Sequence, residues 1–350
     1  MDITFLAPCK DLSGGIKVIA TYAELLQARG HNVTVVYPRP QIPKLRKLKR
    51  DILNFVKRER DHLDAFTGKL LAVDQVNDNT IPHGDILIAT AWETAEWARD
   101  LSETKGRKFY LIQGHEVWNG QQARVYATLK LPFTKITISS WLKSLISEIS
   151  RDQHIELIPN GCDFVLTESQ ALTDNRKYDV GMTYSSIPNK GADIGLRAMF
   201  KLARHNPTLK FAVFGTESPD VDLPLNMRIF VKPSRATIAK IYQQTKIWMS
   251  SSYEEGFCLP CLEAMSSGAV VVSTDNKGVR DMIQNGTTGF LTPTGKDSDL
   301  AARVNFLLEN PASLKRMQKQ SYEKSTEFSW QQSADQFERL LSQPNAKQAA

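Results

Sequence analysis

Short apolar runs alternate with longer amphipathic segments along most of the chain. The runs have the length of buried strands, and the segments between them repeat apolar residues at helical spacing. The order occurs twice, which predicts two α/β domains, each built on a doubly wound parallel sheet. The expected strands are Ile3–Ala7, Asn32–Tyr37, Asp85–Thr90, Lys108–Gln113 and Thr134–Ser139 in the first block, and Asp179–Thr183, Lys210–Phe214, Arg228–Val231, Lys246–Ser250 and Ala269–Ser273 in the second.

Helices are predicted between these strands and at the end of the chain. A first helix over Ile16–Arg29 ends before Gly30, a residue common after helix C-termini. The polar stretch Phe164–Lys177 is interpreted as the interdomain linker, so we expect domains over residues 1–165 and 171–328. The other expected helices are Ala192–His205, Arg235–Thr245, Leu262–Ser267, Asp297–Asn310, Ala312–Glu327 and Trp330–Leu341.

Composition and charge narrow the class of protein. The 350 residues are 41% hydrophobic and 23% charged, as in an ordinary globular protein. The net charge of +6 favours anionic partners without choosing among nucleotides, nucleic acid and acidic lipid. The strand-like run Ile3–Leu6 follows the first residues directly, and no stretch approaches the roughly 18 apolar residues that span a bilayer. We therefore expect a cytoplasmic protein.

The segment Arg39–Arg60 does not follow the alternation of strand-like and helical segments. It contains nine Lys or Arg residues against two acidic ones, with apolar residues at helical spacing among them. A basic amphipathic helix of this kind either covers its own domain or adsorbs to anionic lipid at the inner membrane face. Both interpretations stay open, whereas nucleic acid is disfavoured because no base-stacking aromatic pattern accompanies the charge.

Cys258 and Cys261 form a Cys-x-x-Cys pair that invites a zinc or redox interpretation. A structural zinc site needs further Cys or His ligands at matching spacing, and the sequence offers no such His pair. We therefore predict that both are buried, small apolar side chains.

The stretch from Ser250 to Gly268 has the clearest chemistry. Glu255 and Glu263 stand on either side of a Gly256-Phe257 turn and a helix start. The turn would present backbone amides near a helix N-terminus, where they can meet anionic or hydroxyl oxygens. A carboxylate can accept hydrogen bonds from two neighbouring hydroxyls, so Glu255 suits a sugar and Glu263 a vicinal diol. The alternative is a capped surface helix with solvated glutamates.

A second candidate site follows the first strand. Ser13, Gly14 and Gly15 stand where a doubly wound sheet meets its ligands, and glycines there allow close approach to a phosphate. The spacing is not that of a dinucleotide-binding loop, and a Gly-Gly pair is equally typical of a tight turn.

These motifs together resemble retaining glycosyltransferase family 4 of the GT-B superfamily, which carries an E-x7-E signature. The resemblance implies two Rossmann-like domains facing a central cleft. The N-terminal domain would bind the acceptor, and the C-terminal domain would bind a nucleotide sugar. The helix over residues 329–342 would pack back on the N-terminal domain. Further matches are Ile158 to Asp163, Asn189-Lys190-Gly191, Gly286 to Leu291, and Trp330.

The resemblance also implies residue roles. Glu255 would hold the donor sugar, Glu263 the ribose and Lys190 the diphosphate, while His115 would lie near the sugar. With Glu255 and Lys190, His115 completes the predicted catalytic set. Trp92 and Glu116 are predicted to lie at the acceptor. The remaining predicted donor contacts are Gly14, Gly15, Arg235, Gly256, Phe257, Cys258 and Leu259.

One position departs from the family pattern. Ser185 stands where the family places an arginine that binds the diphosphate. Either another cation such as Arg235 supplies that charge, or Lys190 and backbone amides hold the phosphates alone. A clamp with one cation fewer is weaker by about 1–3 kcal/mol.

The function implied is retaining transfer of a hexosyl or deoxyhexosyl group without a metal ion or other cofactor. UDP is favoured as the nucleotide, with GDP or dTDP as alternatives. The acceptor would be a saccharide or a lipid-linked sugar in surface polysaccharide or glycolipid synthesis. Two other classes stay open: a GT-B sugar-nucleotide epimerase, and a non-catalytic protein that binds nucleotide sugar or lipid.

Overall fold

The computed structural model describes residues 1–39, 61–117, 121–164 and 166–344. It divides the chain into two compact units. Unit 1 comprises Met1–Pro159 with Trp330–Ala350, and unit 2 comprises Asn160–Ser329. Apart from Arg39, the basic segment 39–60 lies outside the described residues, so its helix and its membrane role stay predictions.

The boundary between the units follows Pro159, earlier in the chain than the linker expected at Phe164–Lys177. That segment belongs to unit 2, where long-range polar contacts hold it. Tyr322 Oη donates to the Leu166 carbonyl at 2.8 Å, and the buried guanidinium of Arg176 donates to backbone carbonyls on two other elements of unit 2. The segment looked like a linker because it is polar, but its polar groups are used internally.

Within the described residues, unit 1 contains a parallel sheet of seven strands in the order β3-β2-β1-β4-β5-β6-β7. Its central strands are buried, which explains their continuous apolar runs. The strand order reverses between β1 and β4, the kind of point at which doubly wound sheets bind ligands. The strands are β1 (Asp2–Leu6), β2 (Asn32–Pro38), β3 (Lys69–Val73), β4 (Ile86–Ala89), β5 (Arg107–Ile112), β6 (Thr134–Thr137) and β7 (Ile155–Leu157).

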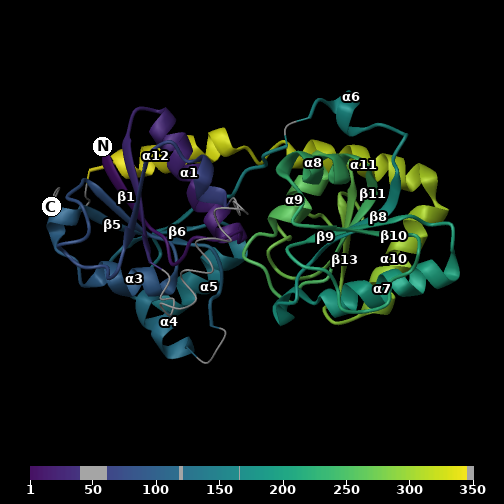
Figure 1. Ribbon diagram of the computed structural model, residues 1–350, viewed down its shortest axis with the longest axis horizontal. Coiled ribbons are helices and arrows are strands. Elements are labelled where there is room, and N and C mark those ends of the chain that lie inside the picture. The colour runs from purple at the N-terminus through teal and green to yellow at the C-terminus, as the bar shows by residue number, and fades with distance from the viewer. Residues whose placement is uncertain (40–60, 118–120, 165, 345–350) are drawn as a thin grey trace, which may run out of the picture. The chain divides into compact units, whose positions relative to one another are not determined.

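The last helix of the chain, α12 (Trp330–Ser342), packs against α1 (Gly14–Ala28) in unit 1 (Figure 1). Phe337 is fully buried and stacks on Tyr22, with ring centroids 4.5 Å apart. Glu338 forms an ion pair with Arg29 at 2.8 Å, and its Oε1 lies 2.8 Å from His31 Nε2. Among its described residues, the other helices of unit 1 are η1 (His62–Ala65), α3 (Trp92–Arg99), η2 (Glu103–Lys105), α4 (Gln122–Leu129) and α5 (Ser140–Ser150).

Unit 2 contains a second parallel sheet, of six strands among the described residues, in the order β10-β9-β8-β11-β12-β13. Its core is formed by the apolar side chains of these strands together with α7, α10 and α11. The strands are β8 (Tyr178–Tyr184), β9 (Phe211–Gly215), β10 (Met227–Val231), β11 (Thr245–Ser250), β12 (Val270–Thr274) and β13 (Gly289–Thr292).

The short helices over Glu168–Ala171 and Pro188–Lys190 were not predicted, and the longer helices of unit 2 follow the prediction except at the start of α9. This helix begins at Leu259 rather than at Leu262, because Pro260 lies in its first turn, where a missing N–H costs nothing. In the part of unit 2 that the structure describes, the helices are α6 (Glu168–Ala171), η4 (Pro188–Lys190), α7 (Ala192–His205), α8 (Arg235–Gln243), α9 (Leu259–Ser266), α10 (Asp297–Glu309) and α11 (Pro311–Ser325).

Every strand that the apolar pattern predicted is present, with ends that shift by one or two residues. The strands that the pattern missed are β3, β7 and β13, and each lies at the edge of its sheet. Edge strands are paired on one side only, so short and partly polar sequences suffice for them.

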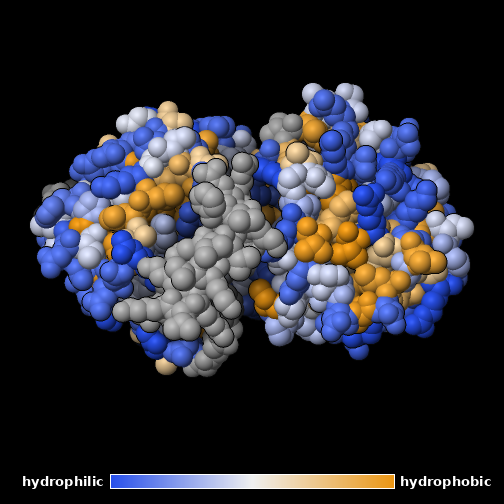
Figure 2. Space-filling model, in the orientation of Figure 1, coloured by the Kyte–Doolittle hydropathy of each residue, from blue (hydrophilic) through white to orange (hydrophobic). Residues whose placement is uncertain are grey.

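Much of the face shown in Figure 2 is hydrophilic, with apolar residues gathered in patches. The helices among the described residues lack the length and apolar content needed to cross a membrane. The large apolar side chains exposed among the described residues are Leu12, Ile187, Val221, Leu225, Val231, Tyr253 and Phe306.

The buried aromatic contact of α12 gives a stability prediction. Replacing Phe337 with alanine (Phe337→Ala) removes a ring that packs on Tyr22 and leaves a cavity in unit 1. The free energy of unfolding of unit 1 should fall by about 3–5 kcal/mol in urea denaturation followed by circular dichroism. Gln336→Ala, an exposed position on the same helix, is the matched control and should change it by less than about 0.5 kcal/mol. Equal stability of the two variants would show that α12 does not belong to the core of unit 1.

Candidate functional site

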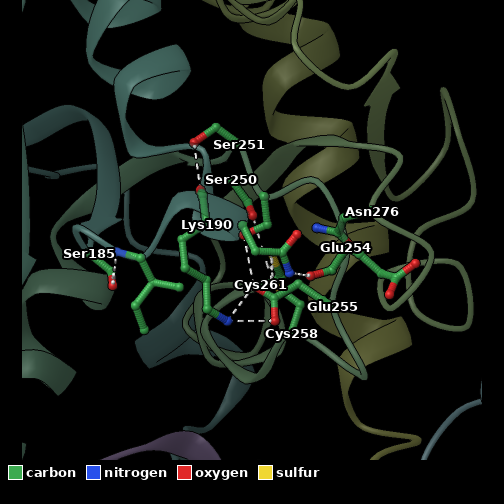
Figure 3. A network of polar contacts seen from close by, with 12 residues as sticks. Ser185, Lys190, Ser250, Ser251, Glu254, Glu255, Cys258, Cys261 and Asn276 are labelled. Atoms are coloured by element: carbon green, nitrogen blue, oxygen red, sulfur yellow. Dashed lines mark hydrogen bonds and ion pairs between the residues drawn. The ribbon is translucent and has the colours of Figure 1, made fainter. Parts of the chain in front are cut away.

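The centre of the candidate site in unit 2 is an ion pair between Lys190 and Glu255 (Figure 3). Lys190 Nζ lies 2.8 Å from both carboxylate oxygens of Glu255. Lys190 ends η4, which follows β8, and Glu255 lies in the loop between β11 and α9. Burial by itself lowers the pKa of Lys190, but the Glu255 carboxylate outweighs this and raises the pKa above its usual value. The lysine is therefore a cation at neutral pH.

The Glu255 carboxylate is held by more than the lysine. Ser252 Oγ, which is almost fully buried, donates to Glu255 Oε1 at 2.7 Å. The Glu255 amide donates to the Asn276 carbonyl at 2.9 Å. A Cβ atom on Gly278 would lie 2.6 Å from the Glu255 carbonyl oxygen, so only glycine allows this close approach of the two loops. The carboxylate is thus fixed in orientation before any ligand arrives.

The lysine is anchored just as closely. Gly191, which follows it, has φ +55°, and a Cβ there would lie 2.2 Å from the Ser251 carbonyl oxygen. Asn189 Nδ2 donates to the Glu254 carbonyl at 2.8 Å. These contacts join the loops at the carboxyl ends of β8 and β11, which are neighbours in the sheet.

Phe257 and Cys258 turn their side chains into the core, which leaves the backbone for any ligand. Phe257 is buried against Phe328, with ring centroids 5.8 Å apart. Cys258 precedes α9 in a left-handed conformation, with φ +67°. Its Sγ lies 3.1 Å from Cys261 Sγ, and both cysteines are free and buried, as the sequence predicted.

Glu263 lies on α9 and is 6% exposed. Its Oε2 accepts a hydrogen bond from Tyr242 Oη at 2.9 Å. Burial, followed by the Glu263 charge, raises the pKa of Tyr242 well above its usual value, so the phenol remains a donor. The hydroxyl group of Tyr242 already gives Glu263 the kind of contact that a ligand hydroxyl would make.

Ser185, which replaces the family arginine, and Arg235, the alternative cation, both interact with other residues of unit 2. Ser185 Oγ accepts a hydrogen bond from the Ile187 amide at 3.3 Å. Arg235, the alternative cation, forms an ion pair at 2.8 Å with Asp163, whose side chain is only 5% exposed. The structure therefore places the Arg235 guanidinium on an acidic partner within unit 2.

The remaining predicted residues lie in unit 1. Gly14 and Gly15 form the first turn of α1, after the capping residue Ser13. Glu116 Oε2 accepts a hydrogen bond from the Trp92 amide at 2.9 Å, and His115 Nε2 lies 3.4 Å from Tyr126 Oη. These residues follow β1, β4 and β5, which are adjacent strands of the sheet.

Several residues of the site were missed from the sequence. Ser252, Asn276 and Gly278 hold Glu255, and Tyr242 contacts Glu263. Of these residues, only Ser252 could have been inferred from the sequence, since it lies three residues before Glu255 in a motif rich in small polar residues. The others lie on separate elements, and no spacing rule connects them to the motif.

As for metal ligands, no group of three or more His, Cys, Asp or Glu side chains within the described ranges is arranged to hold an ion.

The family comparison concerns unit 2. Residues 167–324 match the family model "Glycosyl transferases group 1". A D-inositol 3-phosphate glycosyltransferase of Rhodococcus erythropolis is 27% identical over 164 residues, which cover 42% of this chain and 37% of the relative. A protein of the same name from Kribbella flavida is 28% identical over 165 residues, 42% of this chain and 39% of the relative. The chain thus matches less than half the length of these curated relatives.

Solved structures extend the likeness to the whole chain. The Anabaena protein HepE in complex with UDP-glucose has a TM-score of 0.73 at 15% identity, covering 98% of this chain and 99% of that one. Sucrose-phosphate synthase of Thermosynechococcus elongatus has a TM-score of 0.71 at 16% identity, covering 97% and 98%. The chain therefore has the predicted GT-B fold of two Rossmann-like units, and its residues 167–324 match the glycosyl transferases group 1 model.

Proposed function

We propose that the protein is a retaining glycosyltransferase that moves a sugar from a nucleoside diphosphate sugar to an acceptor hydroxyl. The observation that carries the proposal is the Lys190–Glu255 pair beside the start of α9, in the segment that matches the glycosyl transferases group 1 model. A nucleotide sugar offers a diphosphate to the lysine and hydroxyls to the carboxylate. It therefore has a partner for each half of the pair.

The donor contacts follow from that placement. Glu255 accepts hydrogen bonds from the sugar hydroxyls, and Lys190 binds the diphosphate. The backbone of Gly256, Phe257, Cys258 and Leu259 adds amide donors at the start of α9. Glu263 accepts from the ribose, and Arg235 contacts the nucleotide once it leaves Asp163. UDP is the favoured nucleotide because the Anabaena neighbour was crystallised with UDP-glucose, while GDP and dTDP are the alternatives.

The proposed chemistry needs one cation and no metal ion or other cofactor. The bond between the anomeric carbon and the phosphate oxygen breaks, and its electron pair stays on the diphosphate, where Lys190 neutralises the charge. The acceptor oxygen attacks the same face and passes its proton to the leaving phosphate oxygen. A double displacement would need a free carboxylate nucleophile. Glu255 is engaged by Lys190 and Ser252, which favours its role in holding hydroxyls.

Unit 1 is proposed to bind the acceptor near Trp92 and Glu116, with Gly14, Gly15 and His115 completing the donor site. A saccharide or lipid-linked acceptor in surface polysaccharide or glycolipid synthesis suits a protein at the inner membrane face. Membrane association depends on the basic segment 39–60, and a cytoplasmic location is part of this proposal.

The function is tested by incubating the protein with UDP-, GDP-, ADP- and dTDP-sugars and following the sugar by proton NMR. We expect slow donor hydrolysis or transfer in which the first product keeps the anomeric configuration of the donor. Glu255→Gln should keep the fold but lose at least about 100-fold in kcat, because the amide can neither pair with Lys190 nor accept hydroxyls through both oxygens.

Each other result points to a different class. Epimerised donor would indicate an epimerase, and unchanged donor in every mixture would indicate a binding protein. A first product of inverted configuration would exclude retention. Near-wild-type turnover by Glu255→Gln would remove Glu255 from the site. Glu309→Gln, an exposed glutamate at the end of α10, is the matched control and should leave the rate unchanged.

The departure at Ser185 gives a gain-of-function prediction. Ser185→Arg restores the cation that the family places there, and a charge-assisted hydrogen bond to phosphate contributes about 1.5–3 kcal/mol. The Kd of the nucleoside diphosphate should fall at least about tenfold in isothermal titration calorimetry. Ser186→Arg adds the same charge one residue along, where the backbone amide bonds Glu217, and should have a smaller effect. Equal effects of the two variants would show that tighter binding comes from the added positive charge and not from a contact made at position 185.

A further inference from the structure

The loop after β5 holds the loop after β4 at two points. Gln113 Nε2 donates to the Thr90 carbonyl at 3.4 Å, and Glu116 Oε2 accepts from the Trp92 amide at 2.9 Å. Thr90 and Trp92 lie on either side of the residue that precedes α3. The two side chains of the Gln113-x-x-Glu116 motif therefore bracket the start of that helix.

The hydrogen bond from the Trp92 amide to Glu116 gives the first amide of α3 an acceptor that the residues before the helix do not supply. The amides in the first turn of a helix have no intrahelical acceptor, and a Ser, Thr, Asp or Asn before the helix usually supplies one. Here Ala91 precedes α3 and has no side-chain oxygen. Thr94 Oγ1 accepts hydrogen bonds from the amides of Thr90 and Ala91. The Trp92 amide instead donates to Glu116, which lies in the loop after β5.

Gln113 also lies close to the first turn of α1. A Cβ atom on Gly15 would lie 3.6 Å from Gln113 Nε2 and 3.7 Å from Gln113 Oε1, which is ordinary van der Waals distance. The strands concerned, β1, β4 and β5, are adjacent, and the strand order reverses between β1 and β4. Figure 1 shows α1 and β1 in unit 1 with β5 and α3.

We propose that Gln113 and Glu116 are positioning residues that fix the loops after β4 and β5 relative to one another, beside the first turn of α1, so that Trp92 and His115 keep a constant spacing. The inference rests on the proposed transfer reaction, since those loops are where unit 1 meets its ligands. Glu116 then acts through the Trp92 amide and not by contact with substrate. A misplacement of about 1 Å in such a site costs up to about 100-fold in rate.

The environment of Glu116 adds a pH signature. Burial and, to a smaller extent, the charge of Glu93 on α3 raise its pKa to about 7, against the opposing effect of the hydrogen bond from Trp92. Tyr110 faces the same carboxyl group from β5, and burial keeps that phenol neutral by raising its pKa well above its usual value. Below about pH 7 the carboxyl group is neutral and its oxygen still accepts from Trp92. Above about pH 7 it becomes a carboxylate, which is a stronger acceptor, so its hydrogen bond to the Trp92 amide strengthens as the pH rises even though Glu93 opposes the charge.

The test compares Glu116→Gln, Glu116→Ala, Gln113→Ala and the exposed control Glu103→Ala in the full chain, using a donor that the wild type turns over. Glu116→Ala and Gln113→Ala should lower kcat/KM at least about tenfold. Glu116→Gln keeps an oxygen for Trp92, so it should stay within about threefold of wild type. It should also lack the rise in activity that ionisation of Glu116 gives the wild type near pH 7. Hydrogen exchange of the peptide containing Trp92 should speed up in Glu116→Ala and not in Glu116→Gln.

The outcomes separate this inference from the proposed function. A wild type that turns over no donor refutes the proposed function. Unchanged hydrogen exchange at Trp92 in Glu116→Ala independently refutes the claim that Glu116 holds the Trp92 amide. An active wild type with an equally active Glu116→Ala refutes the positioning role alone. A Glu116→Gln variant as impaired as Glu116→Ala, with normal Trp92 exchange, would make Glu116 a charged participant in the reaction and overturn the inference.

Discussion

The ion pair of Lys190 and Glu255 is the contact on which the organisation of the candidate site depends. It joins the loops at the ends of two neighbouring strands, β8 and β11, and each partner is fixed by its own loop. Gly191 and Gly278 allow backbone approaches that no other residue could make without displacement. The pair is partly buried, and its two groups hold each other as a cation and a carboxylate at defined positions.

Other candidate residues are likewise held by polar partners within the protein. Glu263 accepts from Tyr242, Arg235 is paired with Asp163, and Glu116 holds the Trp92 amide. Each of these contacts lies within a single unit. Binding of a polar ligand then exchanges one set of partners for another. The net gain is then smaller than the sum of the new contacts.

The sequence predicted most of the fold because the central strands are buried on both faces and appear as uninterrupted apolar runs. Edge strands β3, β7 and β13 escaped because a strand paired on one side can be short and partly polar. Within the site, Glu255 and Glu263 could be found because they lie in one contiguous motif. The contacts of Glu255 with Asn276 and of Glu116 with Trp92 connect separate loops. Such contacts depend on strand order, which one sequence does not specify.

The most direct test of the central claim is a crystal structure of the protein with UDP-glucose bound. The account predicts a diphosphate oxygen about 3 Å from Lys190 Nζ, with Glu255 accepting hydrogen bonds from the sugar and released from its two-oxygen contact with the lysine. It also predicts the ribose hydroxyls at Glu263. A nucleotide bound elsewhere, with Lys190 still 2.8 Å from both oxygens of Glu255, would contradict the assignment of the donor site.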